Sequence, residues 1–377
     1  MQDQKEDAPG CNRERRNRIT GLIQRTGSAK SRALDVSEYI RASVAGQCRQ
    51  ALAPFGLPFD VEGLRQRASE LAGCSTLLRL KDYFEIDDYR IETFRCRQHL
   101  ICGPCAIVRG TNNVRSIMER FEVVRRTTAG RIYPYLLTMG VKTGPDLSER
   151  CRHMAGCWRK LLEDRRCRSG RHGNELSGLL GGVYSFEAKI GKGAEREGKR
   201  LWNFHMHALI FSPEPLPVQP GIGGDGKARY YWPELSERWR GLTGDSFIVE
   251  CHPIVDRSRA AAVAEGDAMD AVVGDVADGS LIAAVCEVSK YAVKVADSAP
   301  GDAVEAWASL RGRHLCGSFG AFRGVDLAEE NPRLSLRELA AYVEYVYRFN
   351  VGSKGYSIEG FRLHRGVPDG ATKAAMV

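Results

Sequence analysis

WNFHMHALIF, residues 202–211, places two histidines one residue apart inside an otherwise apolar run. Successive side chains of a β-strand point to opposite faces of the sheet. On a strand, His205 and His207 therefore share one face, whereas Phe204 and Met206 lie on the other. We expect a buried strand that presents two imidazoles on one face.

A second strand is predicted just before this one, at GGVYSFEAKIG, residues 181–191. A charged turn joins the two strands, so we expect an antiparallel hairpin. In that pairing Glu187 reaches the face that carries His205 and His207, and two imidazoles with one carboxylate are typical of a metal site with open positions. The alternative is that one histidine is hydrogen-bonded in the core and the other lies at the surface.

A single helix is predicted over SLIAAVCEVSKYAVKVAD, residues 280–297, with an apolar stripe that includes Ile282. Glu287, Tyr291 and Lys294 follow one another at i, i+4 and i+7, so they form a second stripe on this helix. A tyrosine on a helix most often belongs to the core or to an interface. Packing does not explain a carboxylate, a phenol and an ammonium side by side, so we consider these residues candidates for catalysis.

Four cysteines between residues 74 and 105 have the spacing of a zinc site. Cys102 and Cys105 form a Cys-x-x-Cys pair, and Cys74 with Cys96 would complete a tetrahedron of thiolates. His99, in the same run CRQHLICGPC, is an alternative ligand. Buried reduced thiols are the other interpretation of this group.

The composition is that of a folded protein with a basic surface. Of the 377 residues, 43% are hydrophobic, and the formal net charge is +8. Between Arg95 and Arg131 the chain has eight Arg and two Glu, a local excess of six positive charges. Such a run favours a polyanionic partner, most simply nucleic acid, although a solvated helix face explains it equally well.

The start of the chain, MQDQKEDAPGCNRERRNR, lacks the apolar core of a signal peptide, and no uncharged apolar stretch is long enough to cross a bilayer. We therefore expect a cytoplasmic protein that has no membrane partner. In that reducing compartment a disulfide framework is disfavoured for the twelve cysteines.

The order of the patterns predicts four consecutive parts and an α+β fold, in which helices flank an antiparallel central sheet. The sheet's central strands would carry Glu187, His205 and His207, with the helix of Tyr291 laid over that face. The predicted parts are a basic helical N-terminal region at 1–72, a small cysteine-rich, zinc-binding segment at 73–110, a strand-and-helix domain at 130–325 with an Ala/Asp/Gly-rich insertion at about 255–279, and a C-terminal helix (SLRELAAYVEYVYRF) with a flexible tail at 326–377.

Two ordered motifs, H-x-H-x-L-I at 205–210 and E-x-x-x-Y-x-x-K at 287–294, resemble those of the HUH endonuclease superfamily. Within it, the chain looks most like the single-tyrosine initiators of plasmid rolling-circle replication, which have a Glu four residues before the Tyr. YLLTMGV, residues 135–141, sits where that family has its first motif, and RHLCGSFGAF, residues 313–322, resembles a run that follows the tyrosine helix. The likeness covers roughly residues 74–325.

The related initiators also have cysteines before their first motif, with a proline directly after the third one. Here Gly103 separates Cys102 from Pro104.

The resemblance implies a palm-like nicking domain and a role for each candidate residue. His205 and His207, with Glu187 as third ligand, would bind Mg²⁺ or Mn²⁺. Tyr291 would be the nucleophile and Glu287 the base that activates water, while Lys294 would bind the scissile phosphate or assist the phenol.

The implied reaction is sequence-specific nicking and strand transfer at a plasmid origin, through a 5′-phosphotyrosine intermediate. The expected partners are origin DNA, single-stranded or extruded as a hairpin, and the host helicase and polymerase. Three rivals stay open: a non-catalytic zinc-bearing DNA-binding protein, an HUH transposase or relaxase, and a non-haem iron oxygenase, whose site also has two histidines and a carboxylate.

Overall fold

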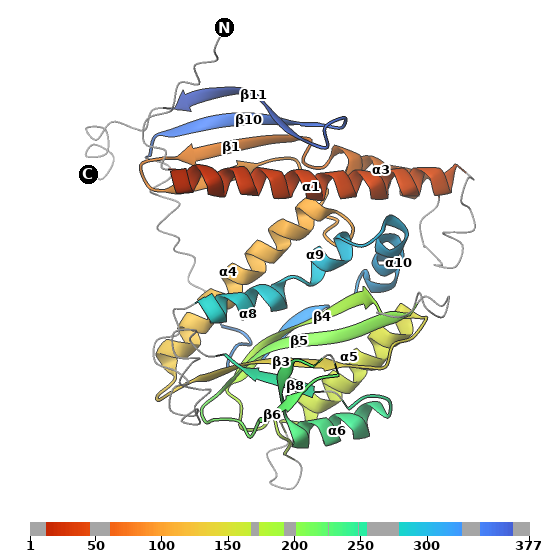
Figure 1. Ribbon diagram of the computed structural model, residues 1–377, viewed down its shortest axis with the longest axis vertical. Helices are drawn as coiled ribbons and strands as arrows, with labels where there is room; N and C mark the ends of the chain where they lie inside the picture. Colours follow the sequence, from red (N-terminus) through yellow and green to blue (C-terminus); the bar gives the residue numbers. More distant parts are fainter. Residues whose placement is uncertain are drawn as a thin grey trace. The chain divides into compact units, whose positions relative to one another are not determined.

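The chain folds into two units, each with its own antiparallel sheet and helices, in the computed structural model (Figure 1). One unit consists of Met1–Ile107 with Ala328–Val377, and the other of Val108–Leu327. The α+β class and the antiparallel pairing predicted from the sequence are thus confirmed. The residues that the structure describes are 13–45, 61–166, 173–191, 201–224, 226–247, 249–254, 279–325 and 340–364.

The unit Val108–Leu327 is built on a seven-stranded sheet in the order β6-β7-β8-β3-β5-β4-β9. The predicted hairpin is β4 with β5, and β5 lies inside the sheet between β3 and β4. The bounds of the strands are β3 (Tyr133–Gly140), β4 (Gly181–Ile190), β5 (Trp202–Ser212), β6 (Gln219–Ile222), β7 (Ala228–Tyr231), β8 (Val249–Pro253) and β9 (Cys316–Gly320).

Helices cover both faces of this sheet (Figure 1). The side chains of β5 are therefore mostly buried on both faces. Leu209 and Phe211 of β5 form a core with α8, on the face to which His205 and His207 also belong. On the opposite face, Trp158 of α5 packs edge-on against Tyr184 of β4. The helices are α4 (Gly103–Thr127), α5 (Leu147–Asp164), α6 (Pro233–Thr243), α8 (Gly279–Ser289), α9 (Tyr291–Ala296) and α10 (Pro300–Leu310).

The single helix predicted over residues 280–297 is wrong, because two helices, α8 and α9, meet at Lys290. The N–H of Lys290 donates to the carbonyl of Glu287 at 3.3 Å, an i to i−3 bond that tightens and ends α8. The predicted apolar stripe is confirmed at Val285, Val288 and Val295, which are buried, but it differs at its first residue. It starts at Leu281, which is 1% exposed, whereas Ile282 is 47% exposed.

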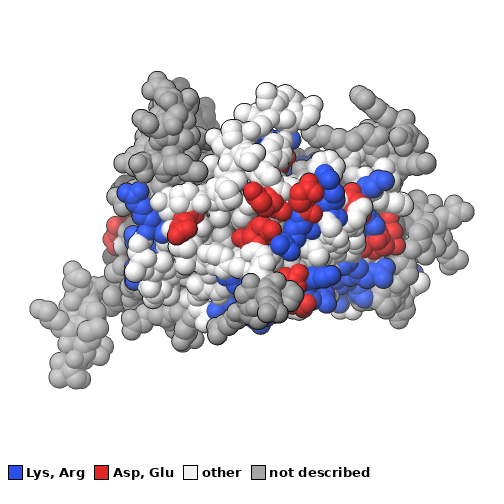
Figure 2. Space-filling view, turned by 90° about the horizontal axis from the view of Figure 1, so that it is seen from below, with Lys and Arg blue, Asp and Glu red and all other residues white. Residues whose placement is uncertain are grey.

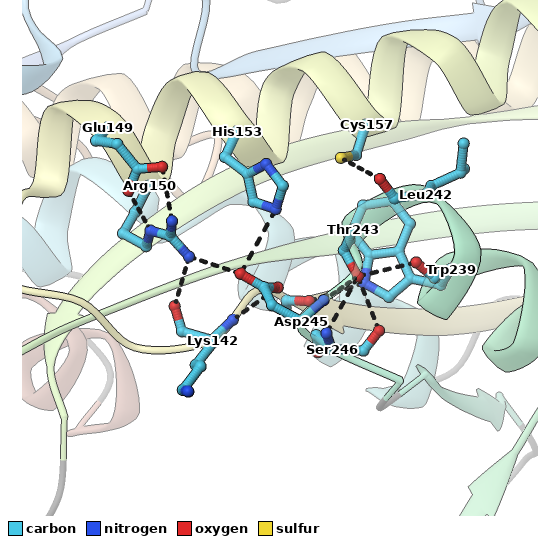
Figure 3. Close-up of polar contacts among 11 residues, drawn as sticks. Lys142, Glu149, Arg150, His153, Cys157, Trp239, Leu242, Thr243, Asp245 and Ser246 are labelled. Atoms are coloured by element: carbon cyan, nitrogen blue, oxygen red, sulfur yellow. Dashed lines mark hydrogen bonds and ion pairs between the residues drawn. The ribbon is translucent and has the colours of Figure 1, made fainter.

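Polar contacts attach α5 to the loop that follows α6 (Figure 3). Arg150 Nη1 donates to Asp245 Oδ2 at 2.7 Å, and the backbone N–H of Lys142 donates to Asp245 Oδ1 at 3.3 Å. Further along α5, His153 Nε2 lies 3.6 Å from Asp245 Oδ2, and Cys157 Sγ donates to a carbonyl in the last turn of α6 at 3.4 Å. These contacts hold α5 in place on the face of the sheet that lies opposite the two histidines.

The other unit has a four-stranded sheet in the order β11-β10-β1-β2, with one face covered by α1. Ile19 and Ile23 of α1 pack on Leu78 and Leu80 of β1. The elements are α1 (Arg13–Val44), α3 (Val61–Gly73), β1 (Leu77–Tyr83), β2 (Asp88–Glu92), β10 (Tyr342–Asn350) and β11 (Gly355–His364). The helical character predicted for the N-terminal region is therefore confirmed for α1 and α3, whereas residues 1–12 and 46–60 lie outside the described residues.

The C-terminal helix and tail predicted for 326–377 are wrong where the structure describes them, because 340–364 form the β10–β11 hairpin. Valine and aromatic residues dominate β10, and such residues favour strands when they can pack on a half-buried face. Tyr345 and Tyr347 pack on the core between the sheet and α1. This hairpin belongs to the same unit as the 73–107 region, so the predicted cysteine-rich segment is not separate. The predicted insertion lies outside the described residues except for Gly279.

Candidate metal centre

Glu187, His205 and His207 meet on one face of the central hairpin, as the alternation of β4 and β5 predicts. Glu187 is the register partner of His205, and Ser185 is the partner of His207. His205 Nε2 lies 3.4 Å from Glu187 Oε1, and His207 Nε2 lies 3.4 Å from Glu187 Oε2. One carboxylate thus faces two imidazoles, each through a different oxygen.

Glu187 and His205 are buried, His207 is largely buried, and some of their polar atoms lack hydrogen bonds. The side chain of Glu187 is 1% exposed, that of His205 7% and that of His207 12%. Within the described residues, Glu187 Oε1 and His207 Nε2 have no hydrogen-bond partner. Buried polar atoms are almost always hydrogen-bonded, so unpaired atoms on two neighbouring side chains of this group are consistent with a missing ligand.

The spacing of these atoms fits a metal ion. Nitrogen and oxygen ligands about 2.1 Å from an ion are about 3.0 Å apart at octahedral angles and about 3.4 Å apart at tetrahedral angles. The two distances of 3.4 Å are close to this range. The second ring nitrogen of His207, Nδ1, lies 3.0 Å from Thr138 Oγ1 of β3, a contact that orients the imidazole as the outer partners of metal-bound histidines do.

Two more charged side chains reach the same face from α8 and α9. Lys294 Nζ donates to Glu187 Oε2 and, at 2.7 Å, to Glu287 Oε1. Glu287 Oε1 in turn lies 3.8 Å from His207 Nε2. The helix break at Lys290 does not separate these residues, so Glu287 and Lys294 meet at the centre as their spacing predicts.

Burial and neighbouring charges set the protonation states of this group. Burial raises the pKa of Glu187, but His205, His207 and Lys294 stabilise its anion and hold the pKa well below its usual range. Burial lowers the pKa of His205, which favours the neutral imidazole that binds metals. Burial also lowers the pKa of Lys294, but its bonds to Glu187 and Glu287 outweigh that effect and raise it.

Tyr291 is the first residue of α9, and α9 runs along β4, the strand of Glu187. Tyr291 therefore lies on the same helix as Lys294, one turn before that lysine. The side chain of Tyr291 lies outside the described residues.

A second group that could hold a metal ion is formed by Cys74, Cys96, Cys102 and Cys105, without His99. Their sulfur atoms are 3.4 Å apart for Cys102 and Cys74, 3.6 Å for Cys74 and Cys105, and 3.7 Å for Cys96 and Cys105. A disulfide needs about 2.05 Å, whereas the sulfur atoms of a tetrahedral zinc site, each about 2.3 Å from the ion, are about 3.8 Å apart. The spacing therefore fits a four-thiolate metal site.

Two residues beside the cysteine group have no clear signal in the sequence. Lys30 of α1 is 1% exposed, and its ammonium donates to the carbonyls of Leu71, at 3.3 Å, and Ala72 at the end of α3. Gly103 begins α4 where α1 passes close by. A Cβ at this position would lie 2.7 Å from the carbonyl oxygen of Ala29, so only glycine fits between Cys102 and Pro104.

The charged residues do not form one continuous basic surface on the face shown in Figure 2. Lys and Arg side chains there alternate with Asp and Glu, next to areas without charge. Exposed basic residues of α5 include Arg152, Arg159 and Lys160.

Comparison of the chain with models of protein families, with curated proteins and with solved structures gives no match. Within the described residues, every helix is too short or too polar to cross a lipid bilayer.

Proposed function

We propose that this protein is a metal-dependent endonuclease of the HUH type, which nicks and rejoins one DNA strand to start and end plasmid rolling-circle replication. The observation that supports this proposal is the meeting of Glu187, His205 and His207 with Glu287 and Lys294 on one sheet face, beside the helix of Tyr291. In the proposal, the seven-stranded sheet is the palm on which the site is built.

His205, His207 and Glu187 would hold the catalytic divalent ion. Mg²⁺ and Mn²⁺ suit a carboxylate and a phosphate substrate, and the two imidazoles favour Mn²⁺. When bound, the ion supplies positive charge that polarises the phosphate oxygens and orients the phosphodiester. The four cysteines would hold a structural Zn²⁺.

Tyr291 would be the nucleophile. Its phenol gives up a proton, its oxygen attacks phosphorus, and the P–O3′ bond breaks, which leaves a 5′-phosphotyrosine and a 3′ oxygen that takes up a proton. Lys294, on the same helix, would bind the scissile phosphate as a point cation. Glu287 would accept a proton from the water that releases Tyr291 by hydrolysis at termination.

The substrate would be single-stranded origin DNA or an extruded hairpin, because in-line attack needs an unpaired and sharply turned backbone. The free 3′-hydroxyl is the primer that a polymerase extends. A helicase that opens the duplex and a polymerase that uses this primer are therefore the expected host partners.

The test is to mix the full chain with single-stranded DNA from its own replicon, with Mn²⁺ or with EDTA. A covalent adduct on Tyr291 that forms only with Mn²⁺ supports the proposal, and peptide mass analysis locates it. Tyr291→Phe should bind the DNA and form no adduct. An adduct with Tyr291→Phe, or none with the unaltered chain on any strand of the replicon, contradicts it.

A second candidate function, a non-catalytic zinc-bearing DNA-binding protein, is favoured by the cysteine group alone. It predicts DNA binding that survives loss of His205 and His207 together, with no nicking under any condition. A transposase or relaxase with the same chemistry would instead form the tyrosine adduct on transposon-end or transfer-origin DNA.

A further inference from the structure

We propose that, in the metal-free protein, the ammonium of Lys294 takes the place of the metal ion on its carboxylate ligand, and that metal binding releases Lys294 toward the DNA phosphate. This inference rests on the metal site of the proposed function. It goes beyond that function because it makes Lys294 a competitor of the ion and not only a ligand of the substrate.

The contacts of Lys294 are those of a bound cation. Its Nζ donates to Glu187 Oε2, the oxygen that also faces His207, and to Glu287 Oε1 at 2.7 Å. Glu187 is 1% exposed, so its negative charge needs a partner inside the protein.

Two other lysines near the site have weaker contacts with the same carboxylates. Lys189 Nζ lies 3.6 Å from Glu187 Oε1, and Lys290 Nζ lies 3.4 Å from Glu287 Oε2. Their side chains are 52% and 50% exposed, whereas that of Lys294 is 30% exposed. Among these three lysines, Lys294 is therefore the main counter-charge of this pair of carboxylates.

A divalent ion and the ammonium cannot both use Glu187 Oε2 without strong repulsion. An ion held by Glu187, His205 and His207 would neutralise the carboxylate, so Lys294 would lose one of its two partners. The released ammonium lies one turn after Tyr291 on α9, at the place where the proposed reaction needs a phosphate ligand. Metal loading and phosphate binding would thus be coupled through one side chain.

The test is Mn²⁺ affinity, measured by calorimetry on the full chain and its variants without DNA. Lys294→Met should bind Mn²⁺ more tightly than the unaltered chain, by about tenfold, since linked binding events typically couple by 5- to 150-fold. Lys294→Gln, which keeps a donor without the charge, should also bind more tightly and guards against misfolding of the methionine variant. Lys189→Met and Lys290→Met are matched controls that remove one positive charge nearby and should change the affinity much less.

The outcomes separate this inference from the proposed function. Equal or weaker Mn²⁺ binding by both Lys294 variants, with binding that His207→Ala abolishes, overturns the inference alone. An equal gain in Lys189→Met also overturns it, because a general charge effect then explains the result. Mn²⁺ binding that His207→Ala leaves intact overturns the metal site itself, and with it the proposed function.

Discussion

Glu187 and His205 face each other across the β4–β5 hairpin, with Glu187 Oε1 3.4 Å from His205 Nε2. Backbone hydrogen bonds between two inner strands fix this pairing, and a slip of one residue would turn His205 and His207 to the opposite face. The centre is therefore placed by rigid strands and not by loops, as a site with strict metal geometry requires.

The orientation of His207 by Thr138 predicts a measurable effect on metal affinity. Thr138→Val removes the oxygen that lies 3.0 Å from His207 Nδ1, so we expect the affinity for Mn²⁺ to fall by about 10- to 100-fold. Ser185→Ala is the matched control. Ser185 is buried and is paired with His207, but its hydroxyl makes no hydrogen bond within the described residues, so the affinity should not change. Equal effects of both substitutions would contradict the role of Thr138.

The cysteine group predicts one tightly bound zinc ion per chain. Cys102→Ser should remove that ion and lower the melting temperature, because a structural zinc site contributes directly to folding. Metal content by mass spectrometry and thermal unfolding check this. Cys316→Ser, a half-buried cysteine outside the group, is the control and should retain the zinc. A zinc-free protein that unfolds at the same temperature with or without Cys102 would contradict the prediction.

The close approach of Gly103 to Ala29 predicts that Gly103→Ala destabilises the protein without removing a sulfur ligand. A Cβ at Gly103 would lie 2.7 Å from the Ala29 oxygen, and such overpacking costs about 1–3 kcal/mol. Gly156 of α5 is the contrasting site, because an added Cβ has no atom within 4 Å there. Gly156→Ala should stabilise by about 0.5–1 kcal/mol, since alanine favours the helix. Urea unfolding of both variants should give shifts of opposite sign.

The buried ion pair of Arg15 and Asp82 predicts a large loss of stability when one partner is removed. Their side chains are 5% and 6% exposed, and Arg15 also donates to the carbonyl of Asp88 at 2.8 Å. Arg15→Met leaves the Asp82 carboxylate buried and unpaired, which costs about 3–5 kcal/mol. Hydrogen exchange of β1 amides should become correspondingly faster.

The control for this prediction is the exposed pair of Arg348 and Glu359. Arg348→Met should leave amide exchange in β1 almost unchanged, because exposed ion pairs add little. Similar exchange rates for Arg15→Met and the unaltered chain would mean that burial of the Arg15 pair does not control the stability of this sheet.

The candidate metal centre could be predicted from the sequence because each of its parts depends on local periodicity. Alternation in β4 and β5 places Glu187, His205 and His207 on one face, and strand pairing brings them together. The sequence places Thr138 on a predicted strand but does not show that it contacts His207. Its contact with His207 depends on the register of β3 with β5, which no local pattern specifies.

The rest of the fold depends on contacts between distant parts of the chain. SLRELAAYVEYVYRF has apolar residues at spacings that a helix also satisfies, so the sequence alone favoured a helix. The segment forms a strand instead because it pairs with β1, and in that position Tyr345 and Tyr347 pack against the hydrophobic core. Lys30 is likewise an ordinary lysine of a basic helix until α3 places two carbonyls beside its ammonium.

The position of β10 between β1 and β11 has a consequence for the order of events during synthesis. β1 leaves the ribosome some 260 residues before its partner β10, and the whole Val108–Leu327 unit is made in between. That unit can fold first, while β1 keeps an unpaired edge that invites aggregation. The nascent chain therefore needs protection of its N-terminal part until the β10–β11 hairpin emerges, and a ribosome that stops before Tyr342 releases a chain whose first sheet lacks two of its four strands.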